Sequence, residues 1–482
     1  MASTTAAVDA KGYRKFGMRD KLAYAAGDFG CNMSFALKGT LTLFWTQFMG
    51  IDSLLMASLL LLVQVWDAIN DPLIGAMVDA DKRQYKRGKF LAYIWCGSLG
   101  LMVAGALCFV PWQSAPAMAK NILFVAGYII WDAFYTIANV PYGSMLSLIS
   151  ADPVERAQLS TWRSIGSMVG GMVAMAVLPM LIYDADNNLL GERVFIIALI
   201  MGIIGFIAFQ FMIRNTVVRV DTTHHKVGEE KQSFNVFKAM GHFVRNRAAV
   251  GATLAPVGMF LGMYGAQVAM QIMFQAYFKN AQISGIVGMF SYVGMFLFVP
   301  FVGKIVTKFG KKEAITVGSL VSVAAYVLMF VLPVTPDGKG LVMFVACQLI
   351  NALGAGIGSC VSWSLMADAM DYEEWKFGTR NEGTTYALHS FFRKLAQGIG
   401  PSMGLVLATW LGYNAAMGPN QLPEVALNMR YLTNGMLLFS AVLQFVAYGI
   451  IYNLDKNTLA KMQHDLGHDV KPVEAKIGFE ED

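Results

Sequence analysis

The chain has 482 residues, of which 56% are hydrophobic and 14% charged, with a mean hydropathy of +0.50 and a net charge of +5. This composition excludes an ordinary water-soluble protein of the same length and indicates an integral membrane protein. The basic residues gather in short segments between apolar runs, so they indicate solvated helix ends rather than a nucleic-acid surface.

Apolar runs long enough to cross a bilayer, which takes about 20 residues, recur along the whole chain. We expect twelve membrane-spanning helices, at about 22–48, 54–80, 91–111, 120–148, 159–182, 194–213, 249–277, 284–305, 314–333, 341–367, 383–411 and 430–453. A polar arm, residues 1–21, leads directly into the first run, so no cleaved signal peptide is expected. Residues 454–482 form a polar tail.

Short basic loops predict the orientation, because Lys and Arg favour the cytoplasmic side of a membrane. The loops after the second and eighth runs carry these residues: Lys82, Arg83, Lys86, Arg87, Lys89, Lys308, Lys311 and Lys312. We therefore expect both termini in the cytoplasm and the chain in the inner membrane.

Neither cysteine nor histidine residues predict a metal site. All five cysteines fall within expected spans, where they indicate apolar packing rather than disulfide bonds. His224 and His225 are adjacent in a polar segment, but no third ligand lies near them in sequence.

The chain is organised as a duplication. The longest polar segment, 214–248, is a linker that divides six spans at 22–213 from six spans at 249–453. Gly75-Ala-Met-Val-Asp79 and Gly303-Lys-Ile-Val-Thr307 are each followed by a basic run, at the same place in each half. This arrangement resembles the major facilitator architecture: an all-α protein of two pseudo-symmetric six-helix bundles with a substrate site between them.

Two carboxylates lie one helical turn apart in the second span. Asp67 and Asp71 share a face, with Asn70 beside them. Like charges in hydrocarbon are costly unless a positive charge sits between them, so the pair predicts a site for a small cation or a proton. The alternative is a buried salt bridge that only locks two helices together.

Several segments resemble the glycoside-pentoside-hexuronide:cation symporter family, whose best-known member is the melibiose carrier. The matching segments, each at its expected helix, are Tyr24-Ala-Ala-Gly-Asp-Phe-Gly30, Trp66-Asp-Ala-Ile-Asn-Asp-Pro72, Asn139-Val-Pro-Tyr-Gly143, Glu155-Arg-Ala-Gln158, Ala367-Asp-Ala-Met-Asp-Tyr372 and Arg380-Asn-Glu-Gly383. The resemblance implies import of a glycoside or hexuronide by symport with H+ or Na+, with no other cofactor, by a protein expected to work as a monomer.

The resemblance also implies site residues. Asp67, Asn70, Asp71 and Thr136 match cation-site positions, which would be the only metal site and would hold Na+. The positions that surround the sugar or link it to the cation are Asn32, Asn139, Arg163, His389, Arg393 and Lys394.

The sequence departs from the melibiose pattern at the sugar site. Cys31-Asn32 replaces Lys-Asp, and Asn139 and Gly143 replace an Asp and a Trp. An amide hydrogen-bonds a hydroxyl but carries no negative charge, so melibiose is not the expected substrate. Fewer anionic oxygens also favour H+ over Na+, because Na+ needs several ligands whereas a proton needs one carboxylate.

Positive residues remain around this site. Arg163, Arg393 and Lys394 favour a substrate with a carboxylate or sulfonate, because a guanidinium matches such anions with two donors. The alternative is that these residues pair with acidic groups of the protein. Asp132 shares a helical face with Thr136 and Asn139, so it either replaces a missing carboxylate of the substrate site or pairs with an arginine.

Two further sets lie in the second half. Tyr264, Gln267, Gln271 and Gln275 recur every three or four residues, which predicts either a cavity wall that includes Gln267 or an interhelical hydrogen-bond seam. Near the end of the tenth span, Asp368, Asp371 and Arg380, together with Asp79 in the first half, predict ion pairs across a gate between the bundles. A solvated surface is the alternative.

Other function classes fit less well. No G-x-x-x-x-G-K-[ST] loop supports an ATP-driven pump. The acidic and basic residues show no nucleophile–base or metal-ligand spacing that would support a membrane enzyme. A lipid or lysolipid transporter of the same fold stays open, and a lateral apolar opening would favour it.

Overall fold

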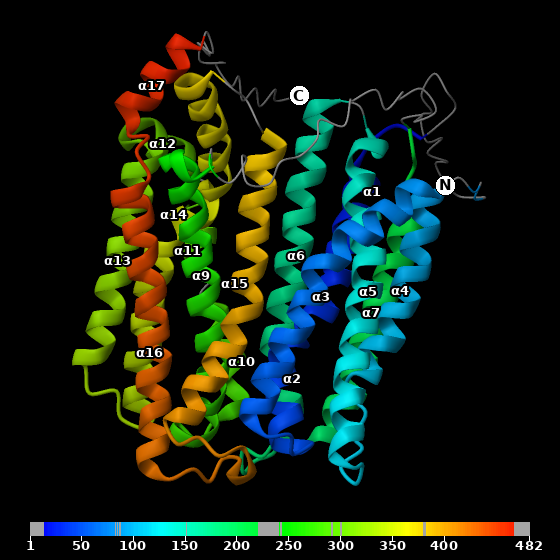
Figure 1. Cartoon of the computed structure of the whole chain (residues 1–482), viewed down its shortest axis with the longest axis vertical. Helices are drawn as coiled ribbons and strands as arrows, with labels where there is room; N and C mark the ends of the chain where they lie inside the picture. The colour runs from blue at the N-terminus through cyan, green and yellow to red at the C-terminus, as the bar shows by residue number, and fades with distance from the viewer. Residues whose placement is uncertain are drawn as a thin grey trace, which may run out of the picture.

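The computed structural model describes residues 14–81, 83, 85, 88–150, 152–219, 241, 243–290, 293–298, 301–378 and 382–466. In these residues the chain is helical, and isolated bridges such as Tyr183 with Leu189 are its only strand-like pairing. Figure 1 shows long helices running side by side between an upper end, where α17 lies, and a lower end. The end of the molecule at α17 is called the upper end, and the opposite end is called the lower end.

The first half forms one bundle. Its helices are α1 (Met18–Phe35), α2 (Lys38–Leu43), the π-helical η1 (Phe44–Phe48), α3 (Ser53–Ala80), α4 (Lys89–Leu107), α5 (Ala117–Ile149), α6 (Pro153–Ile182) and α7 (Gly191–Asn215). Helix α1 packs on α6 and α7, and α4 packs on α5 and α7. The Asp52 carboxylate caps α3 by accepting from the Leu54 and Leu55 amides.

The second half forms the other bundle. Its helices are α9 (Arg247–Ile272), the π-helical η2 (Met273–Tyr277), η3 (Ala281–Ile283), α10 (Ser284–Met289), α11 (Val293–Phe298), α12 (Val302–Phe309), α13 (Lys311–Val331), α14 (Gly338–Phe377), α15 (Glu382–Trp410), η5 (Ala415–Met417), α16 (Pro423–Phe445), the π-helical η6 (Val446–Ile451) and α17 (Lys456–Asp465). Helix α9 packs on α15 and α16, and α13 packs on α14.

Helices that meet a bilayer on most of their surface are strongly apolar. Among the described residues, eight helices are long and apolar enough to cross a membrane: α4, α5, α6, α7, α9 with η2, α13, α14 and α16 with η6. The other four expected spans correspond to α1 to η1, α3, α10 to α12, and α15. Helices α1 and α15 fall short because they carry the polar residues of the interior. The apolar part of α3, Ser53–Asp67, is shorter than a full span within the described residues, and α3 packs directly against α15 of the other bundle.

Two predicted spans are divided differently in the structure. The stretch predicted as one helix at 284–305 is described as the short helices α10, α11 and α12, and residues 291–292 and 299–300 between them lie outside the described residues. Gly285 and Gly294 there lie directly against the backbones of Met175 and Ala352, an approach that any larger residue would block. The first span, predicted as one helix at 22–48, is divided into α1, α2 and η1.

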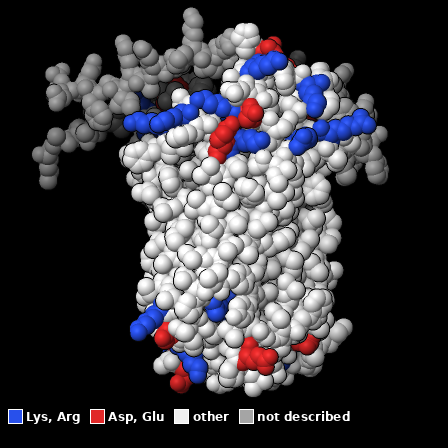
Figure 2. All heavy atoms as spheres, turned by 90° about the vertical axis from the view of Figure 1, so that its left-hand side faces the viewer, with Lys and Arg blue, Asp and Glu red and all other residues white. Residues whose placement is uncertain are grey.

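The outer surface of the C-terminal bundle shows a wide band without charged side chains between the two ends, and Lys and Arg gather at the upper end (Figure 2). On the N-terminal bundle, α3 exposes Val65, Ile69 and Leu73, spaced four residues apart, while Asn70 on its other side is fully buried. A one-sided apolar stripe of this kind is suited to lipid.

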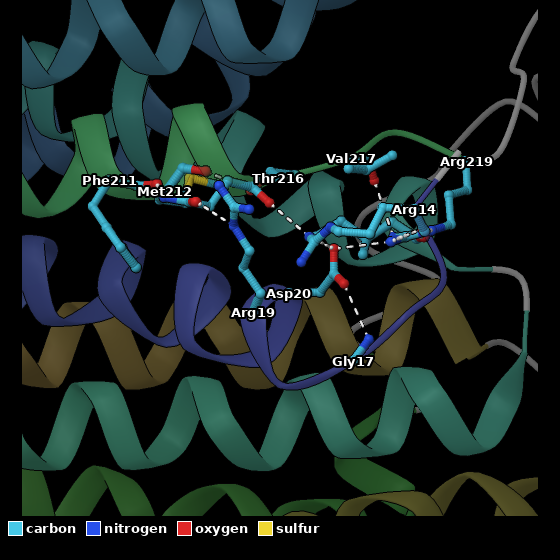
Figure 3. Close-up of polar contacts among 11 residues, drawn as sticks. Arg14, Gly17, Arg19, Asp20, Phe211, Met212, Thr216, Val217 and Arg219 are labelled. Atoms are coloured by element: carbon cyan, nitrogen blue, oxygen red, sulfur yellow. Dashed lines mark hydrogen bonds and ion pairs between the residues drawn. The ribbon is translucent and has the colours of Figure 1, made fainter. Parts of the chain in front are cut away.

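A cluster of polar contacts holds the upper end of the N-terminal bundle together (Figure 3). Asp20, 1% exposed, accepts from Arg14 at 2.8 Å and from Arg219 at 3.1 Å. Arg219 also donates to the carbonyl of Ile149 at the end of α5. The segments before α1 and after α7 are thereby fixed to the same end of one bundle.

Candidate functional site

A buried polar cluster lies halfway along α5. Asn70 of α3 donates through Nδ2 to Asp132 Oδ2 at 3.1 Å and to Thr136 Oγ1 at 2.9 Å. Lys38 of α2 places its Nζ 3.7 Å from Asp132 Oδ1. Asn70, Asp132 and Thr136 are each at most 1% exposed, so the ion pair is held away from bulk water, where charge interactions are strong.

Asp67 lies between this cluster and the other bundle. Its Oδ2 accepts from Gln64 at 3.0 Å. A Cβ atom added at Gly398 of α15 would collide with the Gln64 side chain, so α3 and α15 are in direct contact here. Lys394 of α15 interacts electrostatically with both Asp67 and Lys38. The site therefore has charged members from both bundles.

A second ion pair joins α1 and α6. Arg163 Nη2 lies 3.6 Å from Asp28 Oδ1, and its guanidinium carbon lies 4.9 Å from the centre of the Tyr142 ring. Tyr142 donates to the Tyr24 carbonyl at 2.7 Å. Its ring packs directly against Gly27, where any side chain would collide with the ring. The ring is thus fixed beneath the guanidinium. The Arg163 side chain is 34% exposed, in contrast to the buried Asp132 cluster.

Asn32 and Asn139 lie between the two pairs. Asn32 donates to the Asp28 carbonyl and to Ser167 Oγ, both at 2.9 Å, which leaves its side-chain oxygen as an acceptor. Asn139 Oδ1 accepts from Cys31 Sγ at 3.7 Å. The residues that replace the charged groups of the melibiose pattern thus bond to each other, as Cys31 and Asn139 do, or to an adjacent helix, as Asn32 does.

Two of the predicted substrate residues turn toward their own bundle. His389 is 4% exposed, and its Nδ1 lies 3.0 Å from Thr253 Oγ1 of α9. The Arg393 guanidinium carbon lies 6.0 Å from the centre of the Phe260 ring, also on α9. The structure therefore brings Lys394 to the cluster on α2, α3 and α5 and places His389 and Arg393 against α9.

Polar contacts join the two bundles at the lower end. Gln47 and Gln275 exchange hydrogen bonds at 2.7 and 3.0 Å, and Gln47 also donates to Tyr413 Oη at 2.9 Å. Each glutamine lies in a π-helical segment, η1 or η2, at the same place in the two halves. Higher up the same interface, Gln267 Nε2 would lie 2.6 Å from a Cβ atom at Gly39. At Gln275, the predicted polar stripe forms an interhelical seam.

Asn187 completes this contact. From the loop between α6 and α7, it donates to the Lys279 carbonyl at 3.0 Å and accepts from the Ala281 amide at 2.7 Å. Its own carbonyl accepts from Gln275 at 2.9 Å. Because these bonds use backbone as well as side chains, the two bundles are closely apposed at the lower end.

Two of the predicted gating residues, Asp368 and Asp371, lie in the part of α14 at the upper end. Asp368 pairs with Lys311 at 2.8 Å, and α13 and α14, which carry them, belong to the same bundle, so in this structure Asp368 has a partner within its own bundle and the gate between the bundles stays a prediction. Asp371 lies one turn further along α14. The side chains of Asp71 and Asp79, and the whole of Arg380, lie outside the described residues.

Asp81, which follows α3, is a carboxylate with several hydrogen-bond partners near the predicted gate of the N-terminal bundle. It accepts from Tyr85 Oη at 2.6 Å, from Tyr93 Oη at 2.9 Å and from the Arg83 amide at 2.9 Å. The hydrogen bond from Tyr85, followed by that from the Arg83 amide, lowers the pKa of Asp81 to about 2.

Sequence reasoning did not identify Lys38, Asp28 and Gln47. Lys38 and Asp28 both lie in the first expected span, where any ionisable residue is a candidate functional group, and this signal alone would have found them. Gln47 carries no such signal, because its importance depends on which residue faces it across the bundles.

Two bundles of membrane-spanning helices, with charged and polar side chains where the bundles meet, are the architecture of the major facilitator class. A solved structure of a D-xylose–proton symporter has the same fold, with a TM-score of 0.60 and 15% identity, over 88% of this chain and 96% of that one. The all-α, twelve-span fold predicted from the sequence is thereby confirmed.

Residues 23–456 match the family described as MFS/sugar transport protein, and the chain belongs to this family. It is 29% identical to the uncharacterized symporter YjmB of Bacillus subtilis (strain 168), over 94% of this chain and 96% of that protein. It is 26% identical to a putative sulfoquinovose importer of Salmonella typhimurium, over 92% of each chain. The protein is therefore a sugar transport protein of the major facilitator class, as the family resemblance predicted, and not an enzyme.

Proposed function

We propose that this transporter imports a sugar or glycoside that carries a carboxylate or sulfonate, coupled to H+. The observation that carries the proposal is the Arg163 guanidinium, which lies over the Tyr142 ring with a third of its surface exposed. A guanidinium has five N–H donors, so a single carboxylate at 3.6 Å leaves several of them for a second anion.

A substrate anion would bind Arg163 beside Asp28, and Asn32 would offer a neutral oxygen to a sugar hydroxyl. Lys394 would supply a positive charge from the opposite bundle. A sulfonate or carboxylate suits such a site because charged donors bind it with two parallel hydrogen bonds. A relative described as a putative sulfoquinovose importer supports this substrate class.

The coupling cation is proposed to enter through the carboxylates of the N-terminal bundle, Asp67, Asp71 and Asp132. The described partners of Asp67 and Asp132 include nitrogen donors of Gln64, Asn70 and Lys38, which compete with a Na+ ion for the carboxylate oxygens, whereas a proton needs a single carboxylate. The basic loops support an orientation with the upper end in the cytoplasm, together with both termini. The bonded lower end would then face the exterior, so this state is one in which the outer side is closed.

Uptake by proteoliposomes tests the substrate class. Labelled β-glucuronide, a sulfonated sugar and a neutral glycoside would be compared for the wild type, Arg163→Gln and Arg163→Lys, with the exposed Arg193→Gln as the matched control. Loss of a charged hydrogen bond costs about 1.5–3 kcal/mol, so Arg163→Gln should weaken binding of the anionic sugars about tenfold or more.

The neutral glycoside should bind Arg163→Gln about as weakly as it binds the wild type. Equal losses for anionic and neutral sugars would show that Arg163 only holds helices together. Saturable uptake of the neutral glycoside alone would contradict an anionic substrate.

A further inference from the structure

Lys38 is a charged residue that the substrate proposal does not use. It is the first residue of α2, directly after the break between α1 and α2. Its side chain is 24% exposed, and its ammonium lies 3.7 Å from Asp132, a carboxylate that is almost completely buried. A lysine at this depth is costly unless it has partners, so its surroundings indicate its role.

Aromatic rings enclose the Lys38 ammonium. Nζ lies 5.3 Å from the ring centre of Tyr128, 5.4 Å from Phe35, 5.8 Å from Trp131 and 5.9 Å from Tyr135. Ring faces attract a cation of this kind without supplying the oxygen ligands that Na+ requires. The surroundings of Lys38 thus suit an ammonium group.

The other side of the site consists of oxygen atoms. Asn70 donates through Nδ2 to Asp132 and Thr136, which orients the amide. Its Oδ1 is buried and has no hydrogen-bond partner among the described residues. A carboxylate, an amide carbonyl and a hydroxyl are the ligand types that hard cations take from proteins. The site therefore offers oxygen ligands next to a lysine.

The described charges balance in pairs. Asp132 has Lys38 at 3.7 Å, and Asp67 interacts electrostatically with both Lys38 and Lys394, so two described carboxylates face two lysines here. A Na+ ion beside Asp132 would lie close to the Lys38 ammonium, with no described carboxylate left over to offset the repulsion. An added metal cation is therefore disfavoured as long as Lys38 stays in place.

We propose that the Lys38 ammonium is a tethered cation that neutralises Asp132 and so takes the place of a metal ion beside Asp132, Asn70 and Thr136, so that Na+ binds there only when Lys38 is removed. The inference deepens the proposed symport by stating which cation this site accepts. It does not depend on the identity of the sugar.

Binding of radioactive 22Na+ to the purified full-length protein, at constant ionic strength and without sugar, tests the inference. The wild type and Lys38→Arg should show no saturable Na+ binding above a K+ background. Lys38→Gln should gain saturable binding, and Lys38→Gln with Asp132→Asn should lose it again. Lys339→Gln, which removes an exposed lysine of α14, is the matched control and should behave as the wild type.

Folding of each variant is checked by its elution volume and thermal unfolding curve. Saturable Na+ binding by the wild type that Asp132→Asn abolishes would overturn the proposal. Absence of Na+ binding in folded Lys38→Gln and in folded Lys38→Ala would also overturn it. Because the measurement needs no sugar, failure of sugar uptake would count against the proposed function and not against this inference.

Discussion

The two bundles contribute different chemistry to the interface between them. The N-terminal bundle brings three described carboxylates, Asp28, Asp67 and Asp132, and two of them are paired with Arg163 and Lys38 of the same bundle. The C-terminal bundle brings Lys394 to this charged region and amides such as Gln267 and Gln275 to the surfaces below it.

The difference shows how binding and movement can be linked. Groups that can hold a coupling cation are fixed within one bundle, so cation binding alone needs little from the other. Lys394 makes the opposite bundle sensitive to the charge of Asp67. The relative position of the bundles therefore changes the electrostatic energy of the site, which is the kind of differential interaction that shifts an equilibrium between two states.

Asp67→Asn should uncouple cation binding from the movement of the bundles, and it should have the largest effect on transport. The substitution removes the negative charge that attracts Lys394 and leaves the coupling site with one carboxylate fewer. It keeps the size of the side chain. Loss of an interaction worth about 1.4 kcal/mol corresponds to about a tenfold change, so uphill sugar uptake should fall at least that much.

Sugar exchange across vesicles at equal concentrations should survive in part, because it needs no net cation movement. Asp186→Asn, at an exposed loop position at the lower end, is the control and should transport as the wild type does. Full uphill accumulation by Asp67→Asn would show that coupling does not pass through this residue.

Gln275→Leu tests how much the C-terminal bundle contributes to closing the lower end. It removes the bonds to Gln47 and Asn187 that join the bundles at the lower end. At about 0.5–1.5 kcal/mol for each hydrogen bond, the population with the lower end open should rise about tenfold.

Distances between spin labels at Ser114 and Asn420, on the lower-end loops of the two bundles, would report this opening in a background with Cys96 and Cys360 replaced by serine. Gln421→Leu is the matched control, because Gln421 bonds to Asn414 and Gly418 within one loop. An unchanged distance distribution in Gln275→Leu would mean that the amide seam does not keep the outer side closed.

Asp81→Asn should have the smallest effect. The hydrogen bonds to Asp81 lower its pKa from 3.8 to about 2, so the stabilisation of this loop is fully present above about pH 4 and is lost as the pH falls toward 2. The residue stays charged between pH 5 and 8. The substitution should therefore change the transport rate by less than about threefold, since contacts of exposed charges are weak.

The shape of the pH profile between pH 5 and 8 should be the same for Asp81→Asn and the wild type, measured as initial uptake rates. A shifted midpoint in the variant would place a titrating group of the transport cycle at this loop. The coupling carboxylates of the bundle interior would then not be the sole source of pH dependence.

Sequence periodicity was sufficient for the helices and for contacts within one bundle. Asp132 and Thr136 lie one turn apart on one helix, so their common face is dictated by the helix itself, and Asn70 meets that face. Periodicity cannot show where a helix breaks. The break after Phe35 directs Lys38 toward Asp132, and this is the pairing that the sequence did not predict.

The sequence also could not predict which residues contact each other between the bundles. Gln275 was predicted to belong to either a cavity wall or a seam, because its partner, Gln47, is more than two hundred residues away in the chain and shares no helical face with it. Likewise, Asp368 was assigned to a gate between the bundles, whereas the adjacent helix α13 supplies its lysine.

The claim that this protein moves sugar together with protons is tested most directly by the pH outside vesicles. Purified protein would be reconstituted in Na+-free buffer, and an anionic sugar would be added to the outside in the presence of an external pH dye. The account predicts a sugar-dependent alkalinisation that is absent in Asp67→Asn. No alkalinisation by the wild type, together with stimulation of its sugar uptake by millimolar Na+, would contradict the account.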